Sequence, residues 1–261
     1  MANIATLDFA KFTHGTATER QHTGKALADS LIDHGFVKLV NHGLADETIA
    51  DLIELLRREN IAGHDDLSKL LDARSCQRIS LEIMAAIEVG LGLPPGVLVD
   101  RCRPDASEIR LNRYPPIPRA HLASGLVRRT WPHTDFGIIT LLFQDHVGGL
   151  ELEDRTSPGT FVPIAPVRPG QPAEMIVNAS DTFERWTNSV VRPGLHQVAP
   201  PPPAAGDEIV LPERYSCVFF AKAGRETSAG PLPHFVSEEN PARYDEITAL
   251  QFQQRRTQLL Y

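Results

Sequence analysis

The stretch WPHTDFGIITLL, residues 131–142, decides the fold, because its apolar and β-branched residues are typical of a strand that enters a barrel. Successive side chains of a strand point to opposite faces, so we expect His133 and Asp135 to point the same way and Thr134 the other way. An imidazole beside a carboxylate on a rigid strand supplies two of the three ligands that a divalent first-row metal ion needs. The third ligand should be another histidine.

The best candidate for the third ligand is His196, which follows the turn residues Pro193 and Gly194 and begins an apolar alternation. Two histidines and one carboxylate occupy one face of an octahedron and leave the opposite face open, which is the arrangement of non-haem iron(II) oxygenases. A bidentate co-substrate can take two of the open positions and dioxygen the third. A lone His-x-Asp pair is usually an ordinary surface pair, and it is the ordered combination with His196 that favours a metal site.

A second cluster of polar residues lies on two further strand candidates. Arg214 and Ser216 share a face at the start of an apolar strand, and a buried arginine needs an anion, so the ligand should carry a carboxylate. Asn112 and Tyr114 share a face just before the stop at Pro115. Each of these residues also has an ordinary structural explanation, as an ion pair at a barrel mouth or a partner for backbone groups near the turn.

Taken together, the motifs resemble the 2-oxoglutarate- and iron(II)-dependent dioxygenases of the isopenicillin N synthase-like class, the branch shared by plant and fungal biosynthetic oxygenases. The matching segments are residues 112–116, 133–135, 148–151, 186–188, 196 and 214–216, with residues 7–9 and 34–43 similar to the amino-terminal region of the family. The sequence departs from the family at three positions. Gln197 stands where the family often has Arg, and Ser180 and Ser189 stand where it often has Gly.

The resemblance implies a role for each matching residue. His133, Asp135 and His196 would bind the catalytic iron(II), while Arg214 and Ser216, helped by Tyr114, would bind the distal carboxylate of the co-substrate 2-oxoglutarate. The other end of 2-oxoglutarate would lie near Asn112.

The implied reaction uses dioxygen to oxidise an unactivated C–H bond of a small organic molecule, in secondary metabolism. Hydroxylation is the default outcome, whereas desaturation or a ring change depends on how the substrate is placed. Two alternatives stay open. An oxidase of the isopenicillin N synthase kind would use the same metal triad without a 2-oxo acid, and a non-catalytic jelly-roll binding module would need no convergent ligands. The sequence does not identify the substrate.

The pattern of elements predicts a mainly β protein with flanking α-helices and a double-stranded β-helix, or jelly-roll, core. We expect one dioxygenase domain over residues 1–261, with residues 1–100 mostly helical and residues 101–261 forming the jelly roll and a closing carboxy-terminal helix over 244–258. A capping-box pattern at 16–19 starts the first helix, which should end near Gly35, and a strand over 36–40 follows. Later strands are predicted around 109–114, 138–143, 150–153, 161–164, 174–177, 195–198 and 216–221.

Composition limits the partners and the compartment. The net charge of −7 over 261 residues and the absence of a basic cluster argue against nucleic acid, and no apolar run approaches membrane-spanning length. Three widely spaced cysteines favour reduced thiols in an intracellular protein, and the start of the chain lacks the pattern of a secretory signal. We therefore expect a cytoplasmic enzyme that acts on a small molecule, with an oligomeric state that the sequence leaves open.

One segment is shorter than the family pattern. Family members usually have several dozen more residues where this chain has only residues 57–75, in a region that often borders the substrate. The chain therefore either has a trimmed substrate wall or lacks residues between Leu56 and Ser75, in which case the backbone should show a break there.

Overall fold

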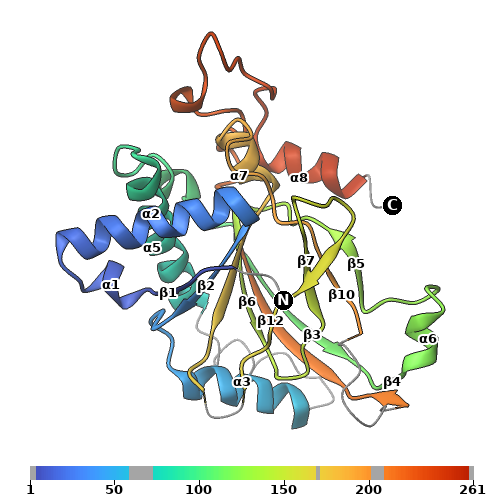
Figure 1. Ribbon diagram of the computed structural model, residues 1–261. Coiled ribbons are helices and arrows are strands. Elements are labelled where there is room, and N and C mark those ends of the chain that lie inside the picture. The colour runs from blue at the N-terminus through green and yellow to red at the C-terminus, as the bar shows by residue number, and fades with distance from the viewer. Residues whose placement is uncertain (1–3, 59–72, 169–170, 201–208, 259–261) are drawn as a thin grey trace.

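The computed structural model describes residues 4–58, 73–168, 171–200 and 209–258, and two facing β-sheets form its centre (Figure 1). The larger sheet has the order β1 (Thr6–Asp8), β2 (Phe36–Val40), β9 (Met175–Ala179), β6 (Ile139–Gln144), β12 (Arg214–Ala221) and β3 (Glu108–Tyr114). The smaller sheet has the order β5 (Thr130–His133), β10 (His196–Val198), β7 (Leu150–Glu153) and β8 (Phe161–Pro163). A short ribbon pairs β4 (Ile117–Pro118) with β11 (Val210–Leu211). Together the sheets form the double-stranded β-helix that the sequence predicts.

Alternation along β6 and β12 separates the two faces of the larger sheet. Leu141 and Phe143 of β6 belong to the main hydrophobic core, whereas the intervening Leu142 belongs to a smaller core between the sheets. In β12, Cys217 and Phe219 pack in the main core, and Val218 faces the other way. Because side chains alternate along a strand, the same register turns the polar residues of β12 toward the space between the sheets.

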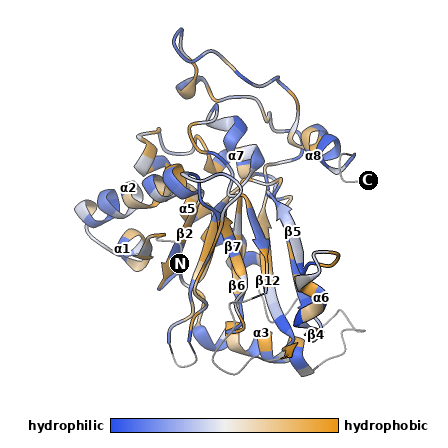
Figure 2. Cartoon of the chain, turned by 45° about the vertical axis from the view of Figure 1, so that its right-hand side comes forward, coloured by the Kyte–Doolittle hydropathy of each residue, from blue (hydrophilic) through white to orange (hydrophobic). Residues whose placement is uncertain are grey.

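Helices cover the outer face of the larger sheet. The two long ones, α2 (Ala17–His34) and α5 (Ala73–Leu91), lie side by side (Figure 1), and the capping box of Thr16 and Glu19 begins α2 as predicted. Gly35 ends α2 with a φ of +74°, a conformation that glycine adopts without strain. The remaining helical elements are α1 (Ala10–Thr13), α3 (Asp46–Arg58), η1 (Val99–Cys102), α6 (Arg119–Ala123), α7 (Asp181–Trp186), η2 (Pro233–Phe235) and α8 (Ala249–Gln258). Figure 2 shows the hydrophobic colour concentrated in the central strands, as along β6.

Three elements differ from the sequence-based expectations. The strand through the metal motif stops at His133, so Asp135 lies in the connection to β6 rather than inside a strand. The last helix begins at Ala249 instead of residue 244. The amino-terminal region also contributes one strand that the sequence analysis does not predict, β1, which pairs parallel with β2 at the edge of the larger sheet.

Residues 59–72 and the prolines at 201–203 lie outside the described residues, so the expectation of a backbone break between Leu56 and Ser75 stays untested. The three cysteines are buried and free. Within the described part of the chain, no helix combines the length and hydrophobicity that crossing a bilayer requires.

Candidate metal centre and its cavity

Two antiparallel strands bring the predicted histidines together. His133 ends β5 and His196 begins β10, and the two residues are direct register partners whose ring centroids lie 4.3 Å apart. Asp135 follows two residues after β5. One ligand atom from each of the three side chains falls in a cluster in which all atoms lie within 4.8 Å of one another. The geometry therefore brings together the three residues that the sequence motif singles out.

Backbone carbonyls fix which nitrogen of each imidazole faces the cluster. Nδ1 of His133 lies 2.9 Å from the carbonyl oxygen of Trp131, and Nδ1 of His196 lies 2.8 Å from that of Gly194. Because a carbonyl oxygen only accepts, each Nδ1 carries the proton and donates it. Nε2 of both rings is then left with a free lone pair, as metal-ligating histidines require.

Hydrogen bonds orient the Asp135 carboxylate in the same way. Its Oδ2 accepts from Thr140 Oγ1 at 2.6 Å and from Asn178 Nδ2 at 3.0 Å, which leaves Oδ1 for a metal. Burial raises the pKa of Asp135, but nearby His196 and the two hydrogen bonds outweigh it and hold this pKa below its usual value. Burial lowers the pKa of His196. A charged carboxylate and a neutral imidazole are the forms that bind a divalent cation.

The ligand cluster opens into a cavity between the two sheets. Side chains from β3, β6, β9 and β12 form one wall, and side chains from β5, β7 and β10 form the other. The lining residues are Arg110, Asn112, Tyr114, Thr130, His133, Asp135, Thr140, Leu142, Leu150, Asn178, His196, Val198, Arg214, Ser216, Val218 and Phe220. All seven residues that the sequence predicts for the metal and the co-substrate are in this set.

Arg214 is a buried cation without a carboxylate partner in the described part of the chain. Its side chain is 1% exposed, and no described carboxylate lies within 4 Å. Nε donates to the carbonyl of Gly148 at 3.0 Å, Nη2 to Gln144 Oε1 at 2.9 Å and Nη1 to Ser216 Oγ at 3.4 Å. A guanidinium has five N–H donors, so these bonds leave donors for an incoming anion. Burial accordingly lowers the pKa of Arg214.

The neighbouring polar residues stand opposite this arginine on the adjacent strand. Tyr114 is the register partner of Arg214, whose guanidinium carbon lies 5.0 Å from the centroid of the Tyr114 ring. Asn112 is the register partner of Ser216 and donates to its hydroxyl at 3.3 Å. The hydroxyl of Tyr114 is 3.1 Å from Thr130 Oγ1. The donor set therefore fits a carboxylate at one end of the cavity and a metal at the other.

Comparison with known proteins agrees with this geometry. Residues 106–223 match the family described as the 2OG-Fe(II) oxygenase superfamily. The 2-oxoglutarate-dependent dioxygenase imqE of Aspergillus flavus is 37% identical in an alignment that covers 100% of this chain and 95% of that protein. The chain belongs to the 2OG-Fe(II) oxygenase superfamily. It is an iron(II)- and 2-oxoglutarate-dependent dioxygenase, similar to fungal enzymes of that kind.

Two further similarities add detail. A longer Aspergillus flavus protein, peptide transporter imqJ, is 55% identical over 190 residues, and the match spans 71% of this oxygenase and 37% of that protein. The fold is that of a full-length Neurospora crassa protein crystallised in complex with alpha-KG, at a TM-score of 0.85 and 24% identity, with 96% of this chain and 94% of that chain covered. The alignment with imqE runs over 350 positions against 261 residues here, so imqE contains additional internal residues.

At position 197, where the family often has Arg, Gln197 connects an arginine and a glutamate from two other segments. Gln197 Oε1 accepts from Arg128 Nη1 at 2.6 Å, and Gln197 Nε2 donates to Glu151 Oε2 at 2.8 Å. The guanidinium of Arg128 is therefore linked to the Glu151 carboxylate through the Gln197 amide, and the position after His196 itself carries no charge. The chain of contacts ties β10, which carries His196, to β7 and to the segment before β5.

Several residues of the site were missed by sequence reasoning. Thr140 and Asn178 orient Asp135, and Gln144 and Gly148 hold Arg214. Thr140 carries a weak signal, because it is the one polar side chain in the apolar run 138–143. Two histidines outside the cluster have ordinary surroundings: His146 is exposed, and His42 is buried with both ring nitrogens bonded to backbone groups.

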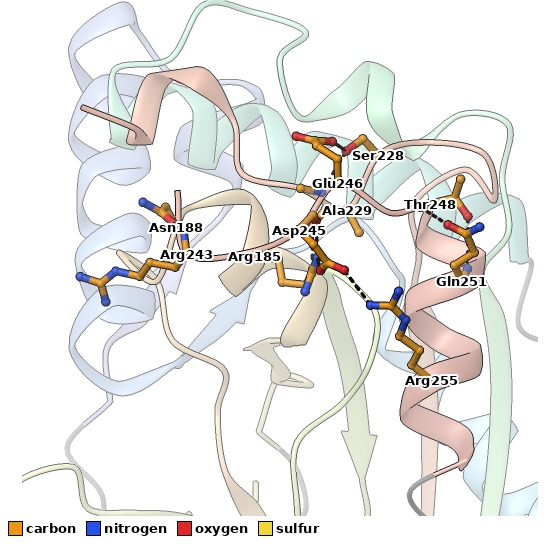
Figure 3. Close-up of polar contacts among 11 residues, drawn as sticks. Arg185, Asn188, Ser228, Ala229, Arg243, Asp245, Glu246, Thr248, Gln251 and Arg255 are labelled. Atoms are coloured by element: carbon orange, nitrogen blue, oxygen red, sulfur yellow. Dashed lines mark hydrogen bonds and ion pairs between the residues drawn. The ribbon is translucent and has the colours of Figure 1, made fainter. Parts of the chain in front are cut away.

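Residues 186–188, one of the segments that resemble the family, form hydrogen bonds to the carboxy-terminal part of the chain. Asn188, at a φ of +48°, donates from Nδ2 to the carbonyls of Phe235, Asn240 and Pro241. Its Oδ1 accepts from the Arg243 amide (Figure 3). Arg185 donates to the Ala229 carbonyl and to Asp245, which also pairs with Arg255 of α8. The pKa of Asp245 falls to about 2 because Arg185 and Arg255 hydrogen-bond to it. This network anchors the segment that leads into α8.

Helix α8 then lies over an outer pocket. Arg256 of α8 has its Nε 2.9 Å from Asp181 Oδ2, and its guanidinium carbon lies 5.0 Å from the centroid of the Phe136 ring. The pocket is lined by Glu108, Arg110, His133, Thr134, Asp135, Phe136, Gly137, Phe220, Lys222, Gln253 and Thr257. Since four of these residues also line the inner cavity, the two spaces meet at His133 and Asp135 of the candidate metal centre.

Proposed function

We propose that His133, Asp135 and His196 bind the iron(II) of this oxygenase and that Arg214 anchors the distal carboxylate of 2-oxoglutarate. The observation that carries the proposal is the state of the donor atoms. Each imidazole has its Nδ1 bonded and its Nε2 free, and Asp135 has Oδ2 bonded and Oδ1 free. Three free ligand atoms within 4.8 Å of one another form the facial set that non-haem iron(II) oxygenases use.

The bound iron, with 2-oxoglutarate and dioxygen, supplies the oxidising chemistry for an unactivated C–H bond. The protein supplies orientation around it. Thr140 and Asn178 hold Asp135 in one rotamer, while the carbonyls of Trp131 and Gly194 hold the two rings. Leu142, Leu150 and Val198 line the cavity with apolar surface and exclude water from the reacting groups.

The co-substrate is oriented by the polar end of the cavity. Arg214 and the Ser216 hydroxyl would donate to its distal carboxylate, with Tyr114 beside them, and Asn112 would lie toward its other end. Docking of a carboxylate gives the buried guanidinium the counter-ion that it lacks among the described residues. Such a pair binds a dicarboxylate in one direction only, because the opposite end of the cavity presents the metal ligands.

The substrate is a small organic molecule that enters through the outer pocket, and hydroxylation is the proposed outcome. Similarity to fungal dioxygenases of secondary metabolism supports a biosynthetic role. We also propose that residues 1–261 act as one domain in the cytoplasm, without a nucleic-acid or membrane partner.

The test is succinate formation from 2-oxoglutarate by the purified protein with iron(II), ascorbate and candidate substrates. His133→Ala and Asp135→Ala should each abolish succinate formation and lower the iron content, while circular dichroism shows that the fold is retained. Full activity in both variants contradicts the proposed triad. Turnover of a substrate without any 2-oxo acid, and without succinate, favours the oxidase that uses the same triad.

A further inference from the structure

Arg110 stands where the inner cavity meets the outer pocket. It lies on β3 two residues from Asn112, on the same face, and it lines both spaces. Its guanidinium carbon is 5.1 Å from the centroid of the Phe220 ring on the neighbouring strand. The side chain is exposed, and no acidic partner lies within 4 Å of it among the residues that the structure describes. The aromatic ring therefore holds in place a guanidinium that is free to bind.

The other cations around the two spaces have anions. Lys222 pairs with Glu108 through an Nζ–Oε1 distance of 2.6 Å, and Arg256 pairs with Asp181. Arg214 is the proposed partner of 2-oxoglutarate. In the loaded centre the charges of iron(II), 2-oxoglutarate, Asp135 and Arg214 cancel one another. Of the charged side chains that line the two spaces in the described chain, only Arg110 then adds a net charge, and that charge is positive.

We propose that Arg110 binds a carboxylate of the substrate, so that the natural substrate is a carboxylic acid with an apolar body. This inference rests on the proposed function. The planar fork of a guanidinium matches a carboxylate bidentately, which fixes both position and direction. The apolar body would contact Phe136 and Phe220, which line the outer pocket. Because Arg110 lies next to the metal end of the cavity, a C–H bond near the carboxylate is the one presented for oxidation.

The alternative occupant is a neutral molecule, whose amide or hydroxyl would bond to Gln253 or Thr257 of α8 and to Thr134. Such groups discriminate little between an acid and its amide. A guanidinium at the junction does discriminate, since only the acid adds a charge-assisted pair. The difference in affinity between an acid and its matched amide therefore measures the role of Arg110.

The experiment is calorimetric titration of arylalkyl carboxylic acids, and of the primary amide of each, into enzyme loaded with iron(II) and 2-oxoglutarate under exclusion of oxygen. The acids that bind the wild type should bind it at least about tenfold more tightly than their amides. Arg110→Met should weaken the acids by about tenfold to a hundredfold and leave the amides unchanged. Arg110→Lys, which keeps the charge without the fork, should lie between the two.

A matched control is Arg113→Met, on the same strand but facing outward, where Arg113 pairs with Glu213. This variant should keep the wild-type preference for acids. The proposal is overturned if no acid of the series binds, if amides bind the wild type as tightly as acids, or if Arg110→Met keeps the preference. It is also overturned if Arg110→Met weakens 2-oxoglutarate itself. Failure of the wild type to bind 2-oxoglutarate would instead refute the proposed function.

Discussion

Replacement of Arg214 by methionine should weaken the binding of 2-oxoglutarate without changing the binding of iron(II). Methionine fills much of the space of the arginine stem but offers no N–H donor, and the side chain is buried, so water replaces little of the loss. A charge-assisted hydrogen bond is worth about 1.5 to 3 kcal/mol, and about 1.4 kcal/mol corresponds to a tenfold change in affinity. We therefore expect Arg214→Met to weaken 2-oxoglutarate binding by roughly tenfold to a hundredfold.

The assay is the free energy of unfolding in urea, measured with iron(II) under exclusion of oxygen, with and without 2-oxoglutarate. At a ligand concentration about one hundred times the wild-type Kd, 2-oxoglutarate should stabilise the wild type by about 2.7 kcal/mol. The same concentration should stabilise Arg214→Met by only about 0.4 to 1.4 kcal/mol, because the ratio of concentration to Kd falls to between about 1 and 10.

Two controls make the result specific. Iron(II) binding without 2-oxoglutarate should be the same in Arg214→Met and in the wild type, since Arg214 touches none of the proposed iron ligands. Arg214→Lys keeps a cation but loses the fork, so it should recover part of the stabilisation. The reasoning is refuted if 2-oxoglutarate stabilises Arg214→Met as much as it stabilises the wild type.

Three further variants test the surroundings of the site. Thr140→Val removes one of the two hydrogen bonds to Asp135 Oδ2 and should weaken iron(II) binding by about tenfold in a competition titration; unchanged affinity would contradict the orienting role of Thr140. Ser189 has a φ of +69°, so Ser189→Gly should be more stable than Ser189→Ala by about 1 kcal/mol in urea unfolding, and equal stability would refute this account of the position. Burial lowers the pKa of His42, so its neutral form stabilises the fold above the unfolded-state pKa of about 6.5, and this stability is lost as the pH falls toward the lower folded-state pKa. Between about pH 6.5 and 5, the melting temperature of His42→Gln should therefore fall by less than that of the wild type. Identical pH profiles of the two melting temperatures would show that His42 titrates without effect.

The residue types of the candidate metal centre could be read from the sequence, but the geometry around them could not. Alternation along the quoted run places His133 and Asp135 on one side, although β5 ends at His133 and Asp135 lies in the connection to β6. Asp135 is instead held by Thr140 of β6 and Asn178 of β9. Which strands become neighbours, and in which register, depends on long-range pairing that a local pattern does not contain.

The closing helix shows how tertiary contacts override a helical pattern. The sequence predicts a helix from residue 244, but Tyr244 and Asp245 stay outside α8. The hydroxyl of Tyr244 bonds to Ser189 at 2.6 Å, and Asp245 bonds to Arg185. Arg110 gives no signal in the sequence for a related reason, because an exposed arginine in a strand looks ordinary until the fold places it, with His133 and Asp135, on the lining of both spaces.

Because His133 and His196 are direct register partners of β5 and β10, the affinity of the proposed triad for iron(II) depends on the correct pairing of these two strands. A slip of β10 by one residue would turn His196 to the outer face and bring Gln197 opposite His133. A misregistered sheet would therefore offer two ligands instead of three and would gain little from iron(II). Since a ligand stabilises only the state that binds it, iron(II) bound at the proposed triad would stabilise the correctly paired sheet over a misregistered one.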